Sequence, residues 1–340
     1  MMPLQQRINA FSKLGQQLGL LTSEMPEAYH TLIRQANAHN GWFTEENIVF
    51  ALNSWSAALT NENLTKWTSN YTFKEKAPKT IAIVMAGNIP LVGFHDFLSV
   101  LISGNHVQVK MSSNDTVLLT FVAKLLVEIA PEFKEAITFT KENLEKFDAV
   151  IATGSNNTAK YFEHYFNKYP NIIRKNRNSV AVITGKETTA QMEALADDVF
   201  RYFGLGCRNV SKVYLPETYD LDHFFNAMYS WKEVINNHKY MNNYDYNKAV
   251  YLMSEIKLLD NEFMLLKEDP GFSSPISVVL FERYKNLEDV QTTLSQQAEH
   301  IQAIVADCGI KNEIPFGVAQ TPALWDYADG VDTLAFINEL

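Results

Sequence analysis

The arrangement that most limits the fold of this chain is a strand, a helix and a second strand within residues 80–110. TIAIVMAG, from Thr80, is a short apolar run rich in β-branched residues, and it ends at the turn Gly87-Asn88-Ile89-Pro90. LVGFHDFLSVLIS then has the length and periodicity of a helix, Gly104 is a suitable C-terminal cap, and HVQVK is a second strand. This order predicts a βαβ unit, and therefore a parallel sheet with a right-handed crossover.

The alternation of strands and helices continues beyond this unit. Further helices are expected at residues 115–130, 156–168, 187–202 and 220–239. Further strands are expected at residues 137–139, 148–152, 180–184, 212–215, 249–253, 276–281 and 301–306, with a polar Asn/Tyr-rich segment at 240–249. Such a series predicts a doubly wound α/β fold.

The pattern divides the 340 residues into four segments. Residues 1–70 carry apolar residues at helical spacing, with Thr44 as a helix start, and we expect a helical cap or an interaction surface there. Residues 71–182 and 183–310 are each expected to form an α/β domain, since about 150 residues is a typical domain. The acidic last segment, residues 311–340, contains aromatic residues, which predict that it packs back on the core.

Composition excludes several classes of function. Lys and Arg number 29 against 39 Asp and Glu, so the formal net charge is −10, which disfavours broad binding to nucleic acid or anionic membranes. No run of ~20 apolar residues predicts a membrane span, and the start lacks the features of a secretory signal. The 2 cysteines cannot form a disulfide framework, so a cytoplasmic location is expected. The sequence has no phosphate-binding loop, no GxGxxG fingerprint and no metal-ligand motif.

The sharpest candidate for chemistry is Cys207 in the segment FGLGCRNVSKVYL. It follows Gly206 and precedes a strand, which predicts a tight turn that a substrate can approach closely. Arg208 and Lys212 are cations near it in sequence, and nearby cations lower the pKa of a thiol toward the reactive thiolate. A buried structural cysteine is the alternative, because free cysteines are often buried. Cys308, in IVADCGI, has no such setting and is expected to be structural.

Small and polar residues gather where three predicted strands end, which is where α/β sheets bind ligands. They are Ala86, Gly87 and Asn88 after the first strand, Lys110, Ser112 and Ser113 at the end of the second, and Thr153, Gly154 and Ser155 after the strand at 148–152. Asn88 has an amide suited to an oxyanion, or it occupies the turn for its conformation alone. The lysine and serines suit a ribose or phosphate, and the helix start after Ser155 suits a phosphate, although helix capping accounts for both. His95 and Asp96 are expected on a helix face or in capping rather than in acid–base catalysis.

Taken together and in order, these segments resemble the aldehyde dehydrogenase superfamily over about residues 78–340, and most closely the LuxC-type fatty acyl-CoA reductases of bacterial luminescence and their shorter relatives. IVMAGNIPLVGFHDFLSVLISGNHVQVKMSSND resembles the superfamily stretch with an Asn-aromatic-Pro turn, a helix and a strand ending in Lys. IATGS resembles its Thr-Gly-Ser loop, FGLGCRNVSKVYL its nucleophile segment and IPFGVAQ its Pro-Phe-Gly segment. The resemblance implies an aldehyde-dehydrogenase-like fold, with two doubly wound α/β domains and an N-terminal helical region. Residues 71–182 would be a Rossmann-like nucleotide-binding domain, and residues 183–310 would carry the nucleophilic cysteine.

The resemblance also implies roles for individual residues. Cys207 would be the nucleophile, and Asn88 with the Cys207 N–H would bind the oxyanion. The cofactor would be NADP, with NAD as the alternative, because Ser113 stands where NAD-preferring members commonly carry a Glu that repels a 2′-phosphate. Lys110, Ser112 and Ser113 would hold the adenosine ribose, Thr153, Gly154 and Ser155 would approach the pyrophosphate, and Ala86 and Gly87 would line the cofactor. Cations for the phosphates are expected among Lys110, Arg174, Lys175, Arg177 and Arg208.

Two features separate this chain from hydrolytic aldehyde dehydrogenases. Those enzymes carry a Glu-Leu-Gly-Gly-Lys segment whose Glu activates water, whereas the matching stretch here, RKNRNSVAVI at residues 174–183, has no carboxylate. A second superfamily glutamate contacts the nicotinamide ribose, and the nearest candidates, Glu268 and Asp269, differ in spacing. We therefore expect an acyl-CoA reductase that forms an acyl-cysteine thioester and reduces it with NAD(P)H to a fatty aldehyde.

Two other functions are compatible with these residues. One is an enzyme of different outcome, either a hydrolytic aldehyde dehydrogenase or a cysteine acyltransferase. The other is a non-catalytic family member that acts as a scaffold or binds a partner through residues 1–70. The expected partner is an acyl-CoA or acyl-protein thioester, with a homo-oligomer or an acyl-transfer protein as further alternatives.

Overall fold

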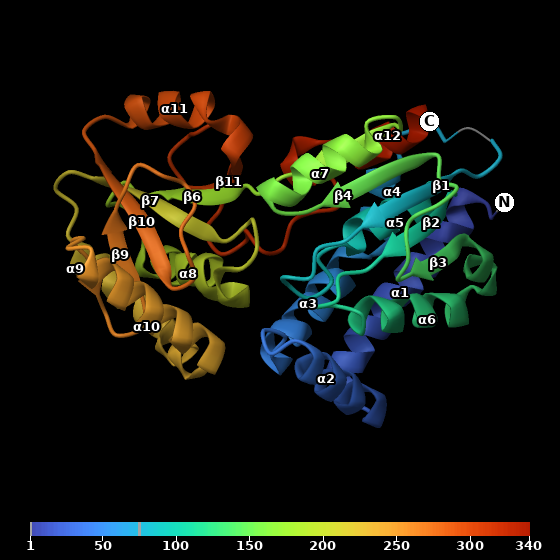
Figure 1. The fold of residues 1–340 in the computed structure, drawn as a ribbon, viewed down its shortest axis with the longest axis horizontal. Helices are drawn as coiled ribbons and strands as arrows, with labels where there is room; N and C mark the ends of the chain where they lie inside the picture. The colour runs from blue at the N-terminus through green and yellow to red at the C-terminus, as the bar shows by residue number, and fades with distance from the viewer. Residues whose placement is uncertain (1, 74–75) are drawn as a thin grey trace. The chain divides into compact units, whose positions relative to one another are not determined.

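The computed structural model describes residues 2–73 and 76–340 and separates into two compact units (Figure 1). The first unit joins Met1–Lys175 to Ala323–Leu340, and the second is the continuous segment Asn176–Pro322. The chain therefore passes to the second unit after Lys175 and returns after Pro322. Relative to the expected boundaries after residues 182 and 310, the second unit begins earlier and ends later.

Five parallel strands form the sheet of the first unit, in the order β3-β2-β1-β4-β5. They are β1 (Thr80–Val84), β2 (His106–Lys110), β3 (Ile137–Thr140), β4 (Ala149–Thr153) and β5 (Asn171–Arg174). β1 and β2 confirm the two strands of the expected βαβ unit, whereas the sequence pattern does not predict β5. The chain extends the sheet outward from β1 in both directions, so the strand order reverses between β1 and β4. In open α/β sheets, ligands bind at the carboxyl ends of the strands at this reversal.

Helices cover both faces of this sheet. They are α1 (Leu4–Glu24), α2 (Glu27–His39), α3 (Glu45–Ala58), α4 (Asn61–Thr68), α5 (Phe94–Ile102), α6 (Leu118–Ile129), α7 (Asn156–Phe166) and α12 (Thr333–Glu339), with 3₁₀ turns at Pro131–Ala136 and Ala328–Gly330. Ile81 and Ile83 of β1 pack into the large core that α5 and α6 share, while Ala82 packs on the other face with Phe162 and Phe166 of α7. Figure 1 accordingly shows α7 and α6 on opposite sides of the sheet.

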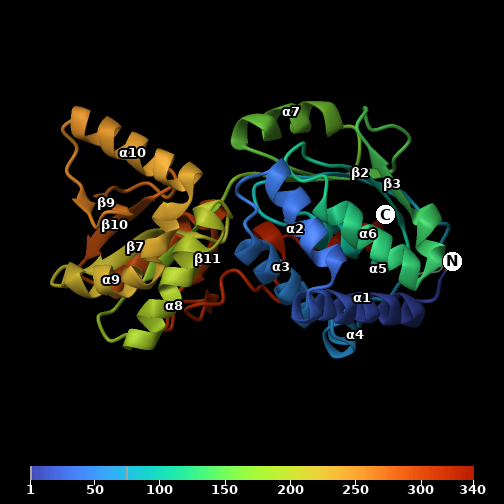
Figure 2. The ribbon, with the colours of Figure 1, turned by 90° about the horizontal axis from the view of Figure 1, so that it is seen from below.

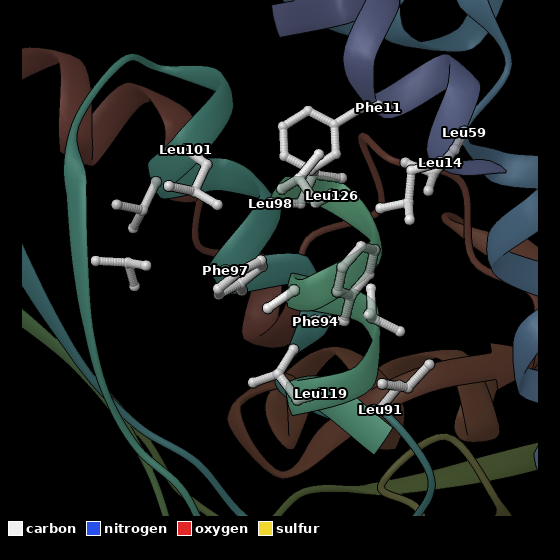
Figure 3. Close-up of a cluster of buried hydrophobic side chains, with 14 of the residues drawn as sticks. Phe11, Leu14, Leu59, Leu91, Phe94, Phe97, Leu98, Leu101, Leu119 and Leu126 are labelled. Carbon is white, nitrogen blue, oxygen red and sulfur yellow. The ribbon is translucent and has the colours of Figure 1, made fainter. Parts of the chain in front are cut away.

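The helices expected within residues 1–70 are present and belong to the core of the first unit. Phe11 and Leu14 of α1 meet Phe94 of α5 and Leu126 of α6 in one buried cluster (Figure 3). Thr44 begins α3 as expected, since its hydroxyl accepts a hydrogen bond from the backbone N–H three residues later at 3.4 Å. The helical region therefore supports the sheet directly.

The second unit has a seven-stranded sheet in the order β12-β11-β6-β7-β10-β9-β8, in which only the β8–β9 pair is antiparallel. Its strands are β6 (Asn178–Val182), β7 (Val210–Pro216), β8 (Leu259–Asp260), β9 (Leu265–Glu268), β10 (Val278–Tyr284), β11 (Ile301–Val305) and β12 (Glu313–Ile314). Its helices are α8 (Thr189–Phe200), α9 (Leu221–Met228), α10 (His238–Met253) and α11 (Leu287–Gln296), with 3₁₀ turns at Arg201–Gly204, Tyr229–Asn236 and Ala298–His300. Figure 1 shows α11 on one face of this sheet and α8, α9 and α10 on the other, and Figure 2 shows these last three helices from below. No helix in the described residues is long and apolar enough to cross a membrane.

The strand expected at residues 249–253 is wrong, because these residues are the last turns of α10. Asn237 caps the helix by accepting hydrogen bonds from the N–H groups of Lys239 and Tyr240. The polar segment at 240–249 continues the same helix, which buries Tyr240, Tyr244 and Asn247 on one side. The apolar residues at its end are mostly exposed, so their β-type composition does not mark a buried strand.

Residues 323–340 pack within the first unit. Trp67 donates a hydrogen bond to the Tyr327 hydroxyl at 2.6 Å, and the Tyr71 hydroxyl donates to Asp332 at 2.7 Å. Leu334 and Ile337 of α12 are buried in the same core as the N-terminal helices. The last residues thus close the fold of the unit that the first residues begin.

Candidate active site

Cys207 is exposed in the loop between the 3₁₀ turn Arg201–Gly204 and β7. The alternative of a buried structural cysteine does not hold for this residue. Its backbone carbonyl accepts a hydrogen bond from the Ser179 hydroxyl of β6 at 3.0 Å, which ties the loop to the neighbouring strand. The thiol therefore lies on a loop that the sheet holds in place, and reagents can reach it.

The backbone before Cys207 has an unusual conformation. Tyr202, Phe203 and Gly204 follow one another with φ angles of 55°, 59° and 73°, in the left-handed region. Glycine adopts this region without penalty, but residues with a side chain do so at a cost of about 1–3 kcal/mol each. The surrounding contacts must offset that cost, and burial of the Tyr202 ring is one of them.

Asn209 closes the turn around Cys207. Its side-chain oxygen accepts a hydrogen bond from Gly206 N at 2.8 Å, and its own N–H donates to the Gly206 carbonyl at 3.0 Å. The side-chain amide donates to the carbonyls of Asp198, Val199 and Arg201 at 3.1, 3.2 and 2.7 Å. Those carbonyls end α8, where helices leave carbonyl groups without intrahelical partners. One buried amide thus caps a helix and fixes the cysteine turn.

Asp198 connects the same helix to the Pro-Phe-Gly segment at residues 314–320. Its carboxylate accepts hydrogen bonds from Gly317 N at 2.6 Å and Ala319 N at 2.9 Å. The side chain has no exposed surface, and this burial raises the pKa of Asp198 to about 7. A methyl group on Gly317 would approach the Cβ of Ala194 to 2.9 Å, so the segment lies directly against α8.

Lys212 does not act as a cation beside the thiol, contrary to the sequence-based expectation. It is completely buried, and its ammonium group pairs with Glu282 of β10 and donates to the Pro270 carbonyl at 2.8 Å. The reason is its place in β7, because the side chain extends across the sheet to the neighbouring strand. The role of Arg208, the other cation expected near Cys207, stays a prediction.

Cys308 has the opposite setting to Cys207. It is partly buried, and its thiol lies 3.8 Å from a carboxylate oxygen of Glu313. Burial and that carboxylate raise the pKa of Cys308 to about 11, so the thiol stays protonated at neutral pH. The expectation of a structural role fits this environment.

The first unit brings the other predicted site residues to one edge of its sheet. Val84, at the end of β1, pairs with Lys110 on β2 and with Ala152 on β4. The segments that follow these three strands therefore begin at the same level. They contain Ala86, Gly87 and Asn88, then Ser112 and Ser113, and then Thr153, Gly154 and Ser155. This edge includes the reversal of strand order between β1 and β4.

The loops at this edge pack too closely for larger side chains. A Cβ on Gly87 would lie 2.6 Å from the Ser112 hydroxyl oxygen and 2.7 Å from its Cβ, and a Cβ on Gly154 would lie 3.0 Å from Thr158 and Phe162. The Ser155 hydroxyl accepts a hydrogen bond from Thr158 N at 3.2 Å, so the predicted helix capping is present. Close-packed glycine loops before a capped helix fit the phosphates of a dinucleotide.

Sequence reasoning missed the contacts that brace these loops. The Asn40 side chain, after α2, donates to the Gly87 carbonyl at 3.4 Å, and His39 hydrogen-bonds the carbonyl of Ser113. The buried Asp115 carboxylate accepts from Leu91 N at 3.4 Å and Leu118 N at 3.3 Å, and burial raises the pKa of Asp115 to about 6. The SSND stretch gave a local signal for Asp115 as a helix start, but nothing local points to residues 39 and 40.

Arg174 is a structural residue and not a phosphate ligand, contrary to expectation. Its guanidinium pairs with Asp96 at 2.6 Å and also donates to the Thr333 hydroxyl at 2.9 Å and the Ala328 carbonyl at 2.8 Å. Both charged side chains are almost fully buried, which leaves no surface for a phosphate. Lys175 pairs with Glu163 at 2.8 Å on the surface.

The two largely parallel sheets and the exposed cysteine loop define a two-unit α/β protein with an accessible thiol. The model of the LuxC family, described as acyl-CoA reductase, matches residues 28–230. The chain belongs to the LuxC acyl-CoA reductase family. No curated protein sequence matches it.

Solved aldehyde dehydrogenases have the same fold. The Mycobacterium tuberculosis enzyme complexed with NAD+ is 12% identical, with a TM-score of 0.65 over 91% of this chain and 74% of that chain. The aldehyde dehydrogenase KauB from Pseudomonas aeruginosa is 13% identical, with a TM-score of 0.66 over 91% of this chain and 78% of that chain. Aldehyde dehydrogenase 21 from Physcomitrella patens, in complex with the reaction product succinate, is 12% identical. Its TM-score is 0.66 over 92% of this chain and 74% of that chain. At these identities the likeness concerns the fold alone, while the LuxC match supports aldehyde-related oxidoreductase chemistry.

Proposed function

We propose that this chain is an acyl-CoA reductase that forms an acyl thioester on Cys207 and releases an aldehyde. The observation that carries the proposal is the exposed Cys207 on a braced turn in a member of the LuxC family. Family membership supports acyl thioester chemistry, and the turn presents a thiol that a substrate can reach.

The first step is acyl transfer to the enzyme. The Cys207 thiolate attacks the carbonyl carbon of the acyl-CoA, a new C–S bond forms, and the bond to the CoA sulfur breaks. CoA leaves as a thiolate that takes a proton from solvent. By resemblance, the backbone N–H of Cys207 would stabilise the oxyanion of this step, a contribution typically worth about 3 kcal/mol per donor.

The second step is reduction of the enzyme-bound thioester. A nicotinamide cofactor supplies the hydride for this step when it is bound. The Cys207 sulfur would hold the reduced acyl group as an alkoxide, and cleavage of the C–S bond would release the aldehyde and return Cys207 as the thiolate. The Cys207 turn has to hold the acyl group in one orientation through both steps.

The loops at the carboxyl edge of the first sheet are the proposed holders of that cofactor. Gly87 and Gly154 let the loops after β1 and β4 pack closely against Ser112 and Thr158, and the first turn of α7 presents N–H groups that suit a phosphate. Lys110, Ser112 and Ser113 would bind the adenosine ribose. A serine at 113 permits a 2′-phosphate, so we propose NADP as the cofactor and NAD as the alternative.

Slow hydrolysis of the thioester is part of the proposal. The stretch that matches the water-activating segment of aldehyde dehydrogenases is occupied by the buried Arg174, the surface Lys175 and Arg177. None of these side chains can act as a general base for water. The acyl group therefore persists until it is reduced or passed to another thiol.

Single-turnover labelling tests the proposal. Wild type, Cys207→Ser and Cys308→Ser are each mixed with a radiolabelled acyl-CoA, quenched in acid and analysed for protein-bound label. We expect wild type and Cys308→Ser to take up about one acyl group per chain and Cys207→Ser to take up none. Equal labelling of Cys207→Ser and wild type would refute the role of Cys207.

The fate of the label separates the reductase from its alternatives. We expect NADPH to convert the bound acyl group to aldehyde. Release of free acid without cofactor would indicate a hydrolase, and transfer to an added thiol at a rate indifferent to NADPH would indicate an acyltransferase. Chains with no label and no nucleotide binding by calorimetry would be non-catalytic.

A further inference from the structure

Two buried polar side chains outside the reacting groups determine the shape of the Cys207 turn. Asn209 is 3% exposed, and Asp198 has no exposed surface. Burial of a polar side chain is costly unless it is fully hydrogen-bonded. Both residues satisfy that demand with backbone groups of the cysteine loop or of segments packed against it.

Asn209 holds Gly206 from both sides. The Gly206 N–H donates to the Asn209 side chain, and the Gly206 carbonyl accepts from the Asn209 N–H. Only Cys207 and Arg208 lie between these two anchor points, so a closed four-residue turn presents the thiol. Rotation of the Asn209 amide would break both the turn and the cap on α8.

Asp198 fixes the position of the cap. Its carbonyl is one of the three that the Asn209 amide binds, while its carboxylate holds Gly317 N and Ala319 N. The end of α8, the segment at 314–320 and the Cys207 turn are therefore connected through two residues. The adjacent carboxylate, Asp197, forms an ion pair instead with Arg201, the residue that follows α8.

We infer that Asp198 and Asn209 are positioning residues, which hold the Cys207 turn in its reactive conformation through the end of α8. The inference rests on the proposed role of Cys207 as nucleophile. Neither side chain touches the substrate in this scheme. Their loss should lower the reactivity of the thiol while the binding of acyl-CoA, measured by its half-saturation, stays unchanged.

The energetics of Asp198 distinguish this role from a merely structural one. Burial disfavours the charged form of Asp198, and the nearby Asp197 charge adds to that effect. Above neutral pH the ionised Asp198 therefore lowers the stability of the folded chain. Asp198→Asn removes the charge but replaces one acceptor with an N–H donor that faces a backbone N–H. The variant should therefore keep its melting temperature at pH 8 and still lose the geometry of the turn.

Alkylation of Cys207 tests the inference without substrate or cofactor. Asp198→Asn is compared with Asp197→Asn, an identical charge change one residue away, both in a Cys308→Ser background. We expect the rate of iodoacetamide modification at pH 8 to fall roughly tenfold in Asp198→Asn and to stay unchanged in Asp197→Asn. The rate of acylation by acyl-CoA should fall in parallel. Asp198→Glu should restore only part of both rates, because its longer side chain moves the carboxylate away from its backbone partners.

Two results would overturn the inference. One is a wild-type alkylation rate in a folded Asp198→Asn chain, and the other is an equal loss in Asp197→Asn. If Asp198→Asn fails to fold, hydrogen exchange of wild type replaces it, and fast exchange of Gly206 N relative to β7 would refute a braced turn. Alkylation needs no acyl-CoA, so a protein without reductase activity can still show the expected alkylation rates. Failure of the proposed function and failure of this inference can therefore be told apart.

Discussion

At the residue scale, the two cysteines show how environment decides the use of one side chain. Cys207 is exposed on a glycine-flanked turn, and Cys308 is partly buried beside Glu313. The residues around each thiol in the sequence already separate them, because only Cys207 has glycines before it and a cation after it. Local spacing predicted this contrast, but it could not predict Asp198 or Asn209. Their partners at residues 206, 317 and 319 are joined only when the chain folds.

Asp198 should make stability depend on pH in a defined direction. Burial raises the pKa of Asp198 from 3.8 to about 7, so the folded chain binds a proton in this range that the unfolded chain has released. The stability from that proton is complete below about pH 3.8 and is lost as the pH rises through about 7. Asp115, whose pKa is raised to about 6, adds a smaller effect of the same sign.

Urea unfolding at pH 5, 6, 7 and 8 measures this dependence. We expect Asp198→Asn to become more stable relative to wild type as the pH rises, because wild type loses stability in this range and the amide does not titrate. A difference that stays constant across these pH values would show that the buried carboxyl titrates normally. Asp245→Asn, which removes an exposed carboxylate of α10, serves as the control and should leave the slope of wild type unchanged.

At the element scale, the strands that are buried on both faces are the ones that the sequence predicts best. β1 and β4 have continuous β-branched and small apolar residues, so their composition and length agree. β5 and β9 each contain two apolar residues followed by a charged end, which gives no clear period, and the sequence pattern misses them. The opposite error occurs in α10, whose last residues have strand composition but are exposed on a helix. In both cases tertiary burial, and not local preference, determines the element.

Gly87→Ala tests whether the loops at the carboxyl edge of the first sheet bind the cofactor. The added methyl group would meet Ser112 at 2.6–2.7 Å and push the loops after β1 and β2 apart. We expect binding of NADPH, followed by fluorescence or calorimetry, to weaken at least roughly tenfold. Alkylation of Cys207, on a loop of the other unit, should keep its wild-type rate. Unchanged NADPH affinity would argue for a different cofactor site.

At the scale of the whole molecule, a buried ion pair joins the last segment of the chain to the first sheet. Arg174 ends β5, Asp96 lies on α5, and Thr333 begins α12. The sequence predicted that the last segment packs on the core, yet not that the segment ends a discontinuous unit. That connection depends on two crossings of the chain between units, which no local pattern marks.

Asp96→Ala should strongly destabilise the first unit. Removal of one partner leaves the Arg174 charge buried with neutral acceptors only, which typically costs about 3–5 kcal/mol. Glu27→Ala, which removes the exposed pair with Arg34, should cost less than about 1 kcal/mol. Chemical denaturation of both variants measures the difference, and equal costs would mean that the buried pair contributes no more than a surface one.

The insertion of one unit within the other also orders events in time as the chain is synthesised. Residues 176–322 form a continuous unit and can fold as soon as they emerge, because domains generally fold as units. The sheet that is synthesised first must wait for residues 323–340, since Trp67 and Arg174 find their partners there. The middle of the chain thus matures before its beginning, and a ribosome that stalls near the end would leave a finished cysteine-bearing unit attached to an open one. Chaperones and proteases would meet the first unit, and not the second, as the vulnerable part of the nascent protein.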